Sequence, residues 1–190
     1  MEINEHAMES ASLIKLFIAG TTYELIEKGE LTETDTISHA LHEMITVSDN
    51  ESSNVLVRSF CDESGDFQTG LDKVNDFIQR MGFTNTAQVN GIADPSLWVA
   101  DGRINETSTA DCGKLLEMIY DRELVSHFAS FRFENLLNNP VKCSPSVFAS
   151  SKIGIIPVPV PRSNACSPFF TLANPDRSTA SIPKQNPFSF

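Results

Sequence analysis

Apolar residues recur at helical spacing along most of the first 138 residues, with polar residues between them. A period of three to four residues is typical of helices that bury one face. We therefore predict an almost all-helical body, with helices over residues 12–28, 34–47, 51–60, 71–81, 108–119 and 126–137. Residues 83–106 show no clear period and are predicted to form a long loop, and no strand is predicted before Ser12.

Cap and turn residues indicate where these helices begin and end. Ser10 or Ser12 is expected to cap the first helix, because a serine side chain accepts a bond from a free N–H of the first turn. Ser108 and Asp111 have the spacing of a capping box. Further boundaries are expected at Gly29 and Gly82 as helix ends, and at Thr34, Gly70 and Ser126 as helix starts.

The composition changes near Asn139. Residues 1–138 hold 24 Asp/Glu and 9 Lys/Arg, whereas residues 139–190 hold 1 and 5 and also nine of the ten prolines. We predict two parts, a helical region over residues 1–138 and an irregular Pro- and Ser-rich tail over residues 139–190. One hypothesis is that translation leaves the ancestral reading frame near Asn139, and the alternative is a genuine Pro-rich extension.

The charge of the chain limits its partners. The formal net charge is −11, which argues against nucleic acid because phosphate binding needs clustered Lys and Arg. No stretch is long and apolar enough to span a membrane. The acidic start, residues 1–5, does not resemble a signal peptide, so the sequence leaves the localisation open.

No metal or other cofactor is expected. His39 and His42 share a helix face but have no third ligand nearby. The cysteines show no Cys-x-x-Cys spacing, and the two in predicted helices are expected to be buried free thiols. The four cysteines are Cys61, Cys112, Cys143 and Cys166.

The first of two strings that carry candidate catalytic residues is Ser12-Leu13-Ile14-Lys15. Positions i and i+3 share a helix face, so Ser12 and Lys15 are expected side by side at a helix start. Free N–H groups and a partial positive charge there suit an oxyanion, and they favour a lowered pKa for a desolvated Lys15. Ser12 is thus a candidate nucleophile and Lys15 its base. The alternative is an N-cap serine beside a solvated surface lysine.

The second informative string is Ser48-Asp49-Asn50, which interrupts a helical pattern. In a catalytic interpretation the Ser48 hydroxyl passes a proton to a leaving nitrogen. Asn50 would hold Lys15 and bind the substrate, while Asp49 would fix the turn. The alternative is a helix-breaking turn without catalytic function.

These strings, in this order, resemble the helical half of a class A β-lactamase, and more closely the broader β-lactamase-type enzyme family. Residues 8–18 resemble the nucleophile helix, residues 44–54 the second motif with its following helix, and residues 105–111 the helix start after the Ω loop. The resemblance implies a mainly α fold for residues 1–138. This fold is the helical subdomain of the β-lactamase/transpeptidase-like α/β fold, with the sheet largely missing.

The same resemblance assigns roles to particular residues. It implies that Ser12 is the acylated nucleophile, that Lys15 is its base, and that Ser48 and Asn50 are the second-motif pair. Class A enzymes also carry Glu-Pro-x-Leu-Asn in the Ω loop, where the glutamate activates the deacylating water. The nearest match here is the string Asp94-Pro95-Ser96-Leu97-Trp98.

Asp94 is therefore a candidate deacylation carboxylate, although its side chain is one methylene shorter than glutamate. A displacement of about 1 Å can cost on the order of a hundredfold in rate. Trp98 also replaces the asparagine of the family pattern. The alternative is that Asp94-Pro95 forms an ordinary loop turn.

The third motif of the family, Lys-Thr/Ser-Gly on a strand, has no clear counterpart. Lys152-Ile153-Gly154 has its outline, but isoleucine replaces the hydroxyl residue. The prolines Pro157, Pro159 and Pro161 follow at once, and proline at alternate positions cannot sustain a central strand. We therefore expect a chain that lacks most of the family's sheet, both here and before Ser12.

The resemblance implies a serine hydrolase that opens a β-lactam amide through an acyl-serine intermediate. We expect a truncated monomer of impaired activity that acts on a small β-lactam or a peptidoglycan peptide. One alternative is a D-Ala-D-Ala peptidase of the penicillin-binding type, which works without a deacylating glutamate. The other is a non-catalytic remnant of the family. Proteins of this family are usually secreted or periplasmic.

Overall fold

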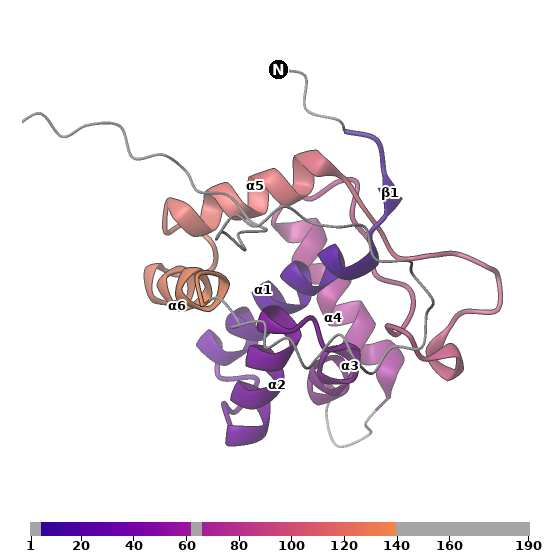
Figure 1. The fold of residues 1–190 in the computed structure, drawn as a ribbon, viewed down its shortest axis with the longest axis horizontal. Helices are drawn as coiled ribbons and strands as arrows, with labels where there is room; N and C mark the ends of the chain where they lie inside the picture. The colour runs from indigo at the N-terminus through magenta and orange to yellow at the C-terminus, as the bar shows by residue number, and fades with distance from the viewer. Residues whose placement is uncertain (1–4, 62–65, 140–190) are drawn as a thin grey trace, which may run out of the picture. The chain divides into compact units, whose positions relative to one another are not determined.

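Six α-helices account for most of the described residues, 5–61 and 66–139, in the computed structural model of the chain (Figure 1). The helices are α1 (Ile14–Glu27), α2 (Asp35–Thr46), α3 (Asn50–Ser59), α4 (Phe67–Arg80), α5 (Thr109–Tyr120) and α6 (His127–Leu137). Two 3-10 turns, η1 (Ala11–Leu13) and η2 (Pro95–Leu97), and two short strands, β1 (Met8–Glu9) and β2 (Glu106–Thr107), complete the described part. The predicted mainly α architecture is therefore confirmed.

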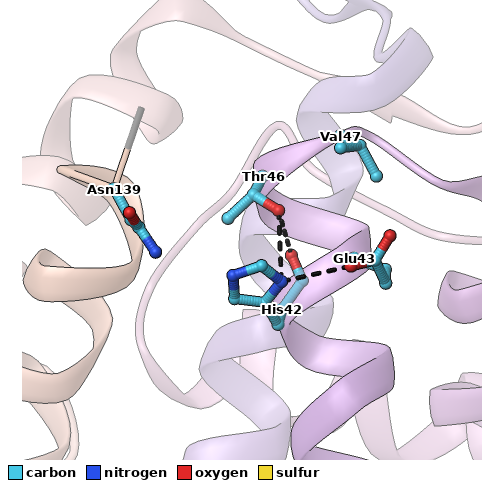
Figure 2. A pocket seen from close by; sticks show the side chains of 5 residues that line it. All are labelled: His42, Glu43, Thr46, Val47 and Asn139. Carbon is cyan, nitrogen blue, oxygen red and sulfur yellow. Dashed lines mark hydrogen bonds and ion pairs between the residues drawn. The ribbon is translucent and has the colours of Figure 1, made fainter. Parts of the chain in front are cut away.

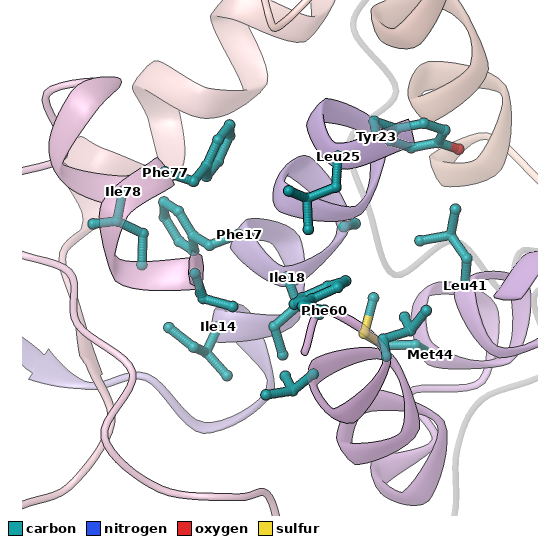
Figure 3. Packing of buried hydrophobic residues seen from close by; sticks show 14 of the residues in the cluster. Ile14, Phe17, Ile18, Tyr23, Leu25, Leu41, Met44, Phe60, Phe77 and Ile78 are labelled. Atoms are coloured by element: carbon teal, nitrogen blue, oxygen red, sulfur yellow. The ribbon is translucent and has the colours of Figure 1, made fainter. Parts of the chain in front are cut away.

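The helix α1 forms the centre of the body and contacts α2, α3, α4 and α6. Every residue of α1 from 17 to 25 is buried, as expected for a helix without a continuous polar face. Figure 3 shows its side chains within the core beside Leu41 and Met44 of α2, Phe60 after α3, and Phe77 and Ile78 of α4. Because α1 is held on several sides, its first turn is a rigid place for a functional side chain.

Three of the predicted helix starts are confirmed by their caps. Thr34 accepts a bond from the N–H of Ile37, Ser108 from that of Asp111, and Ser126 from that of Ala129. The predicted capping box at Ser108 is only half formed. The Asp111 carboxylate instead accepts bonds from the Asn85 N–H and the Thr86 hydroxyl, and so ties the loop to α5.

The start of α1 differs from the prediction. Neither Ser10 nor Ser12 caps a helix with its side chain. The turn η1 precedes α1, and the Leu13 N–H donates to the Ser10 carbonyl at 2.9 Å. A backbone bond thus replaces the expected side-chain cap, and the Ser12 hydroxyl is available for other contacts.

The position predicted for Gly70 is also wrong, because this residue lies inside α4 rather than before it. The helix begins at Phe67, and the Asp66 carboxylate caps it. A Cβ atom at Gly70 would lie 2.1 Å from the carbonyl oxygen of Val57 in α3. Glycine is present there because α3 and α4 approach too closely for any side chain.

Contrary to the prediction, a short strand does precede Ser12. β1 pairs with β2 in antiparallel register, with Met8 opposite Thr107, and the N–H of Ser10 donates to the Asn105 carbonyl at 2.8 Å. Two residues are too few for the alternation that identifies a strand in sequence. This pairing attaches the segment before Ser12 to the end of the long loop.

The long loop itself, residues 83–106, is irregular apart from η2 and one bridge to β2, as predicted. Side-chain amides take the place of strand partners along it. Asn75 of α4 donates to the Gln88 carbonyl at 2.7 Å and accepts from the Gln88 N–H at 2.9 Å. The Asn105 side chain accepts from the N–H groups of Val89 and Asn90.

Cys112 is buried, as expected, whereas Cys61 is partly buried and follows the end of α3. Within the described residues no helix is long and apolar enough to cross a membrane. The predictions on Cys143, Cys166, Lys152-Ile153-Gly154 and the Pro-rich tail lie outside the described residues.

Candidate active site

Four of the five candidate residues converge at the start of α1. Ser12 lies in η1, Lys15 in the first turn of α1, Ser48 between α2 and α3, and Asn50 at the first position of α3. The Lys15 Nζ donates to Ser12 Oγ at 3.4 Å, to Ser48 Oγ at 3.0 Å and to Asn50 Oδ1 at 2.7 Å. It also donates to the Ser48 carbonyl at 2.6 Å. We call these four residues the serine–lysine cluster.

The two hydroxyl groups of the cluster also contact each other. The Ser48 hydroxyl donates to Ser12 Oγ at 3.0 Å, across 36 positions of sequence. Ser48 Oγ is therefore 3.0 Å from both Ser12 Oγ and Lys15 Nζ, closer than these two atoms are to each other. A proton can pass between Ser12 and Lys15 either directly or through Ser48.

Burial divides the cluster into an exposed nucleophile and a covered amine. Ser12, Ser48 and Asn50 are exposed, whereas Lys15 is only 2% exposed. Leu13 and Val47, which flank the two serines in sequence, are exposed at 37% and 49%. A ligand can therefore reach Ser12 Oγ, while Lys15 lies beneath it.

This burial acts on the protonation of Lys15. It lowers the pKa of the Lys15 amine below the usual lysine range, and the nearby charge of Asp49 partly opposes that effect. A desolvated amine disfavours its charged form, which is what a general base requires. The direction agrees with the sequence prediction for a desolvated Lys15, and burial is its main cause.

Asp49 fixes the turn that carries Ser48. Its carboxylate accepts a bond from the Ser52 N–H at 2.6 Å and so caps α3, and that bond is the main cause that lowers the pKa of Asp49. Ser48 has a φ of +59°, in the left-handed region that L residues seldom adopt. Such backbone strain persists only where its surroundings hold it, and it is common at functional sites.

Ala11, directly before Ser12, has a φ of +43°. Two of the N–H groups that the sequence suggested for an oxyanion are occupied on this side. The N–H of Leu13 is bonded to the Ser10 carbonyl, and that of Ile14 to the Ser12 carbonyl. The 3-10 turn therefore uses two of the donors that an ordinary helix start would leave open.

The fifth candidate, Asp94, is engaged elsewhere. Its Oδ1 atom accepts bonds from the N–H and the hydroxyl of Ser96 at 3.0 and 2.7 Å, which caps η2. These two bonds lower the pKa of Asp94. Within the described part of the chain, its hydrogen-bond partners do not include the serine–lysine cluster, so the geometry corresponds to the loop-turn alternative.

A shallow hollow of about 260 Å³ lies beside Ser48, at the end of α2. His42, Glu43, Thr46, Val47 and Asn139 line it (Figure 2). The His42 ring contacts the Glu43 carboxylate at 3.2 Å and the Thr46 hydroxyl at 3.4 Å. The serine–lysine cluster is not part of its lining. No group of three metal-ligating side chains occurs within residues 5–61 and 66–139.

Sequence analysis did not identify Asn54 as a functional candidate. Its side chain, 3% exposed in α3, donates to the Ile92 carbonyl at 3.0 Å and accepts from the Ile92 N–H at 2.8 Å. Asparagine is a poor residue for a helix interior. Its position directly before the apolar residues 55–57 of α3 was the signal that could have identified it.

Comparison with known proteins places this chain in a family. The model of the β-lactamase enzyme family matches residues 33–145, which is more than half of the chain. The chain belongs to the β-lactamase enzyme family. The matched range contains Ser48 and Asn50 and begins after Ser12 and Lys15. A comparison with curated protein sequences found no match.

Solved structures of other proteins share the fold. A β-lactamase from Sphaerobacter thermophilus aligns with a TM-score of 0.61 at 16% identity, over 74% of this chain and 59% of that one. PBP-A aligns with a TM-score of 0.57 at 21% identity, over 71% of this chain and 55% of that one. A mutant of PBP-A in an acyl-enzyme complex with penicillin G gives a TM-score of 0.58.

These alignments confirm the predicted helical part of a β-lactamase-type fold. The chain spans less than 60% of the length of the solved structures it matches. At these identities the likeness establishes the fold alone, since one fold carries many activities. The chemistry has to be argued from the serine–lysine cluster.

Proposed function

We propose that the chain is a serine acyl-transfer enzyme of β-lactamase type, in which Ser12 is acylated by a β-lactam. The observation that carries this proposal is the position of Lys15 Nζ within hydrogen-bonding distance of both Ser12 Oγ and Ser48 Oγ. A nucleophile beside a desolvated base, with a second proton carrier between them, is the arrangement that acyl transfer requires.

Acylation begins when neutral Lys15 accepts the hydroxyl proton of Ser12, directly or through Ser48. Ser12 Oγ then forms a bond to the lactam carbonyl carbon, and the carbon–nitrogen bond of the ring breaks. The Ser48 hydroxyl donates its proton to the leaving nitrogen and regains one from the Lys15 ammonium. The product is an ester on Ser12, and water must hydrolyse this ester to complete turnover.

The contacts of Asn50 support this assignment. Its side-chain oxygen accepts a bond from Lys15 Nζ at 2.7 Å. The amide nitrogen of Asn50 does not take part in this bond. That nitrogen can donate to a substrate carbonyl at the exposed side of the cluster. Membership of the β-lactamase enzyme family supports the same chemistry, as does the fold shared with PBP-A, a mutant of which was solved as an acyl-enzyme complex with penicillin G.

The test is covalent labelling with a fluorescent penicillin followed by peptide mass mapping. We expect one adduct per folded chain, on Ser12, which is lost in Ser12→Ala. Ser38→Ala is the matched control, because Ser38 is an exposed serine of α2 outside the cluster. If the folded wild-type chain carries no adduct on Ser12, the proposed function is wrong.

A D-Ala-D-Ala peptidase of the penicillin-binding type is the second candidate, favoured by one observation. The Asp94 carboxylate is bonded to Ser96 rather than to the cluster, so deacylation has no evident carboxylate base among these contacts. Such a site would release penicillin slowly and still turn over a D-Ala-D-Ala peptide. The measurement is the adduct lifetime beside the rate of D-alanine release.

A further inference from the structure

The two serines of the cluster divide a bound substrate into two sides. In the proposed acylation, Ser12 Oγ bonds to the carbonyl carbon and the Ser48 hydroxyl donates to the leaving nitrogen. The two Oγ atoms are 3.0 Å apart, so they lie at the two ends of the bond that breaks. Substituents of the carbonyl carbon therefore extend from the Ser12 side, and substituents of the leaving nitrogen extend from the Ser48 side.

The hollow at the end of α2 lies on the Ser48 side. Its lining includes Val47, the residue directly before Ser48 in the chain. Consecutive Cα atoms are about 3.8 Å apart, so the wall of the hollow begins one residue from the hydroxyl that protonates the leaving nitrogen. A substituent carried by the leaving-nitrogen side of a substrate is thus directed towards this hollow.

The hollow is large enough for a small ring and is accessible to one. Its volume is about 260 Å³, whereas an apolar cavity of about 150 Å³ accommodates benzene. The side chains of His42 and Glu43 are 46% and 33% exposed, and Asn139 is exposed at the end of α6 (Figure 2). A ligand can therefore reach the polar groups of the lining from solvent.

The charge of the hollow favours a cation. Glu43 contributes a carboxylate, and no lysine or arginine belongs to the lining among the described residues. The helix α2 ends at Thr46, and the last carbonyl groups of a helix carry a partial negative charge. Near pH 8 the imidazole of an ordinary histidine is neutral, so a neighbouring ring such as that of His42 does not cancel the carboxylate.

We propose that this hollow is a subsite for the leaving-nitrogen side of the substrate, and that it takes a cationic substituent such as an ammonium group or a quaternary ring nitrogen. This inference rests on the proposed acylation of Ser12. Glu43 is then a specificity-determining residue. It attracts the substituent and does not touch the reacting atoms, so it selects among substrates without taking part in proton transfer.

The experiment compares two cephalosporins that differ in one substituent on the leaving-nitrogen side. One carries a pyridinium and the other a neutral phenyl group, each attached through a methylene. The rate of lactam opening by the full chain is measured near pH 8 for both compounds, and the adduct on Ser12 is confirmed by peptide mass mapping. Each rate is divided by the rate of opening in hydroxide, which corrects for the intrinsic reactivity of the compound.

We expect the corrected rate to be about three- to tenfold higher for the pyridinium compound, as for one charge pair near a protein surface. Glu43→Gln should bring the ratio of the two rates close to one. Glu43→Lys should invert the ratio, because it replaces the negative charge by a positive one. Both variants are expected to fold, since Glu43 is partly exposed and lysine is favourable in the last turn of a helix.

Glu51→Gln is the matched control, because Glu51 is an exposed acid three positions after Ser48 and does not line the hollow. This variant should keep the wild-type ratio. The inference is overturned if the wild-type ratio is close to one, if Glu43→Gln leaves it unchanged, or if Glu51→Gln lowers it equally. Absence of a Ser12 adduct with both compounds and with penicillin would instead reject the proposed function.

Discussion

At the scale of single residues, Lys15 shows how burial creates a base. Burying an amine disfavours its charged form. The acceptors around Nζ, which come from Ser12, Ser48 and Asn50, hold the amine beside the Ser12 hydroxyl. A lysine in this position can accept the hydroxyl proton of Ser12 while its amine stays buried.

This environment predicts the pH dependence of acylation. Neutral Lys15 is the active form, so the acylation rate should rise with pH and level off above the lowered pKa of Lys15. Asp49 raises that pKa, so Asp49→Asn should move the midpoint of the profile to lower pH. Asparagine is also a good N-cap, so α3 should remain intact. The measurement is the rate of labelling by fluorescent penicillin across a pH series.

Glu51→Gln is the control for this prediction. Glu51 is an exposed acid in the first turn of α3, close in sequence to the same cap. Its charge is not among the causes that act on the pKa of Lys15. A midpoint that moves equally in Glu51→Gln and Asp49→Asn would contradict a specific effect of Asp49.

At the scale of elements, the contact between α3 and α4 determines the position of the helix that carries Asn50 and Asn54. The backbone of Gly70 lies directly against the Val57 carbonyl. The neighbouring atom belongs to the backbone and cannot move aside as a flexible side chain could. Even a methyl group therefore does not fit at this contact.

Gly70→Ala should therefore destabilise the protein by about 1–3 kcal/mol or more. Gly113→Ala in α5 is the matched change, because a Cβ at Gly113 would meet nothing within 4 Å. Alanine there should stabilise by about 0.5–1 kcal/mol through helix propensity. Urea denaturation of both variants checks the opposite signs, and equal effects would show that α3 and α4 do not approach as described.

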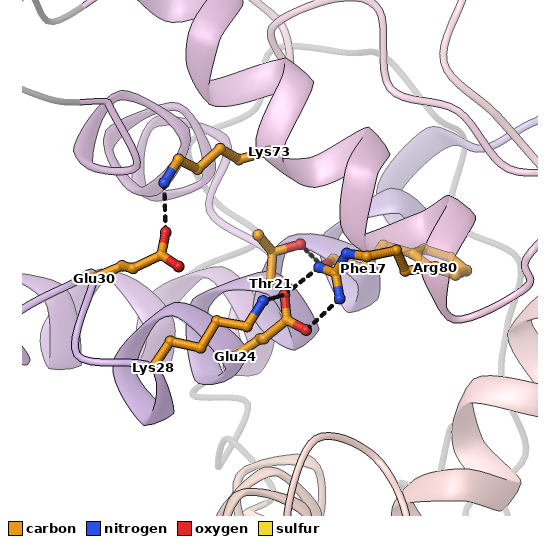
Figure 4. Close-up of polar contacts among 7 residues, drawn as sticks. All are labelled: Phe17, Thr21, Glu24, Lys28, Glu30, Lys73 and Arg80. Carbon is orange, nitrogen blue, oxygen red and sulfur yellow. Dashed lines mark hydrogen bonds and ion pairs between the residues drawn. The ribbon is translucent and has the colours of Figure 1, made fainter.

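At the scale of the whole described body, charged side chains link α1 with α4 (Figure 4). Arg80 donates to the Glu24 carboxylate at 2.8 Å, and Lys28 lies 3.2 Å from it. Lys73 of α4 pairs with Glu30 after α1 at 2.7 Å. The Glu24 side chain is only 10% exposed, so its charge depends on these partners.

Stability should consequently fall in acid. Burial would raise the pKa of Glu24, but the hydrogen bonds and charges of Arg80 and Lys28 outweigh it and lower the pKa below the ordinary value of 4.5. The stabilisation is therefore present above about pH 4.5 and is lost as pH falls through the lower, folded-state pKa. Arg80→Gln should cost about 1 kcal/mol at neutral pH and weaken this acid dependence.

Denaturant unfolding across a pH series measures both effects. Arg103→Gln is the control, since Arg103 pairs with Asp101 on the exposed loop. Because this pair is exposed to solvent, Arg103→Gln should change the unfolding profile less than Arg80→Gln does. An acid dependence that is identical in wild type and Arg80→Gln would show that Glu24 is not stabilised by Arg80.

Much of the local structure and the identity of the proposed acylating residues were predictable from the sequence. Helical period and the caps at Thr34, Ser108 and Ser126 depend on residues a few positions apart, so the pattern identifies them. The positions of Gly70 and of the first cap were not predictable. Both depend on what lies opposite in space, and a single sequence does not contain that information.

By itself, the sequence determined the helices and the two strings that supply Ser12, Lys15, Ser48 and Asn50. Only the tertiary structure decided that Ser48 lies 3.0 Å from Ser12 across 36 positions, that Asp94 bonds to Ser96, and that Asn54 holds Ile92. The physical reason is the range of the forces. Propensity and capping act along a few residues, whereas a site is assembled by packing helices around α1, which no local pattern specifies.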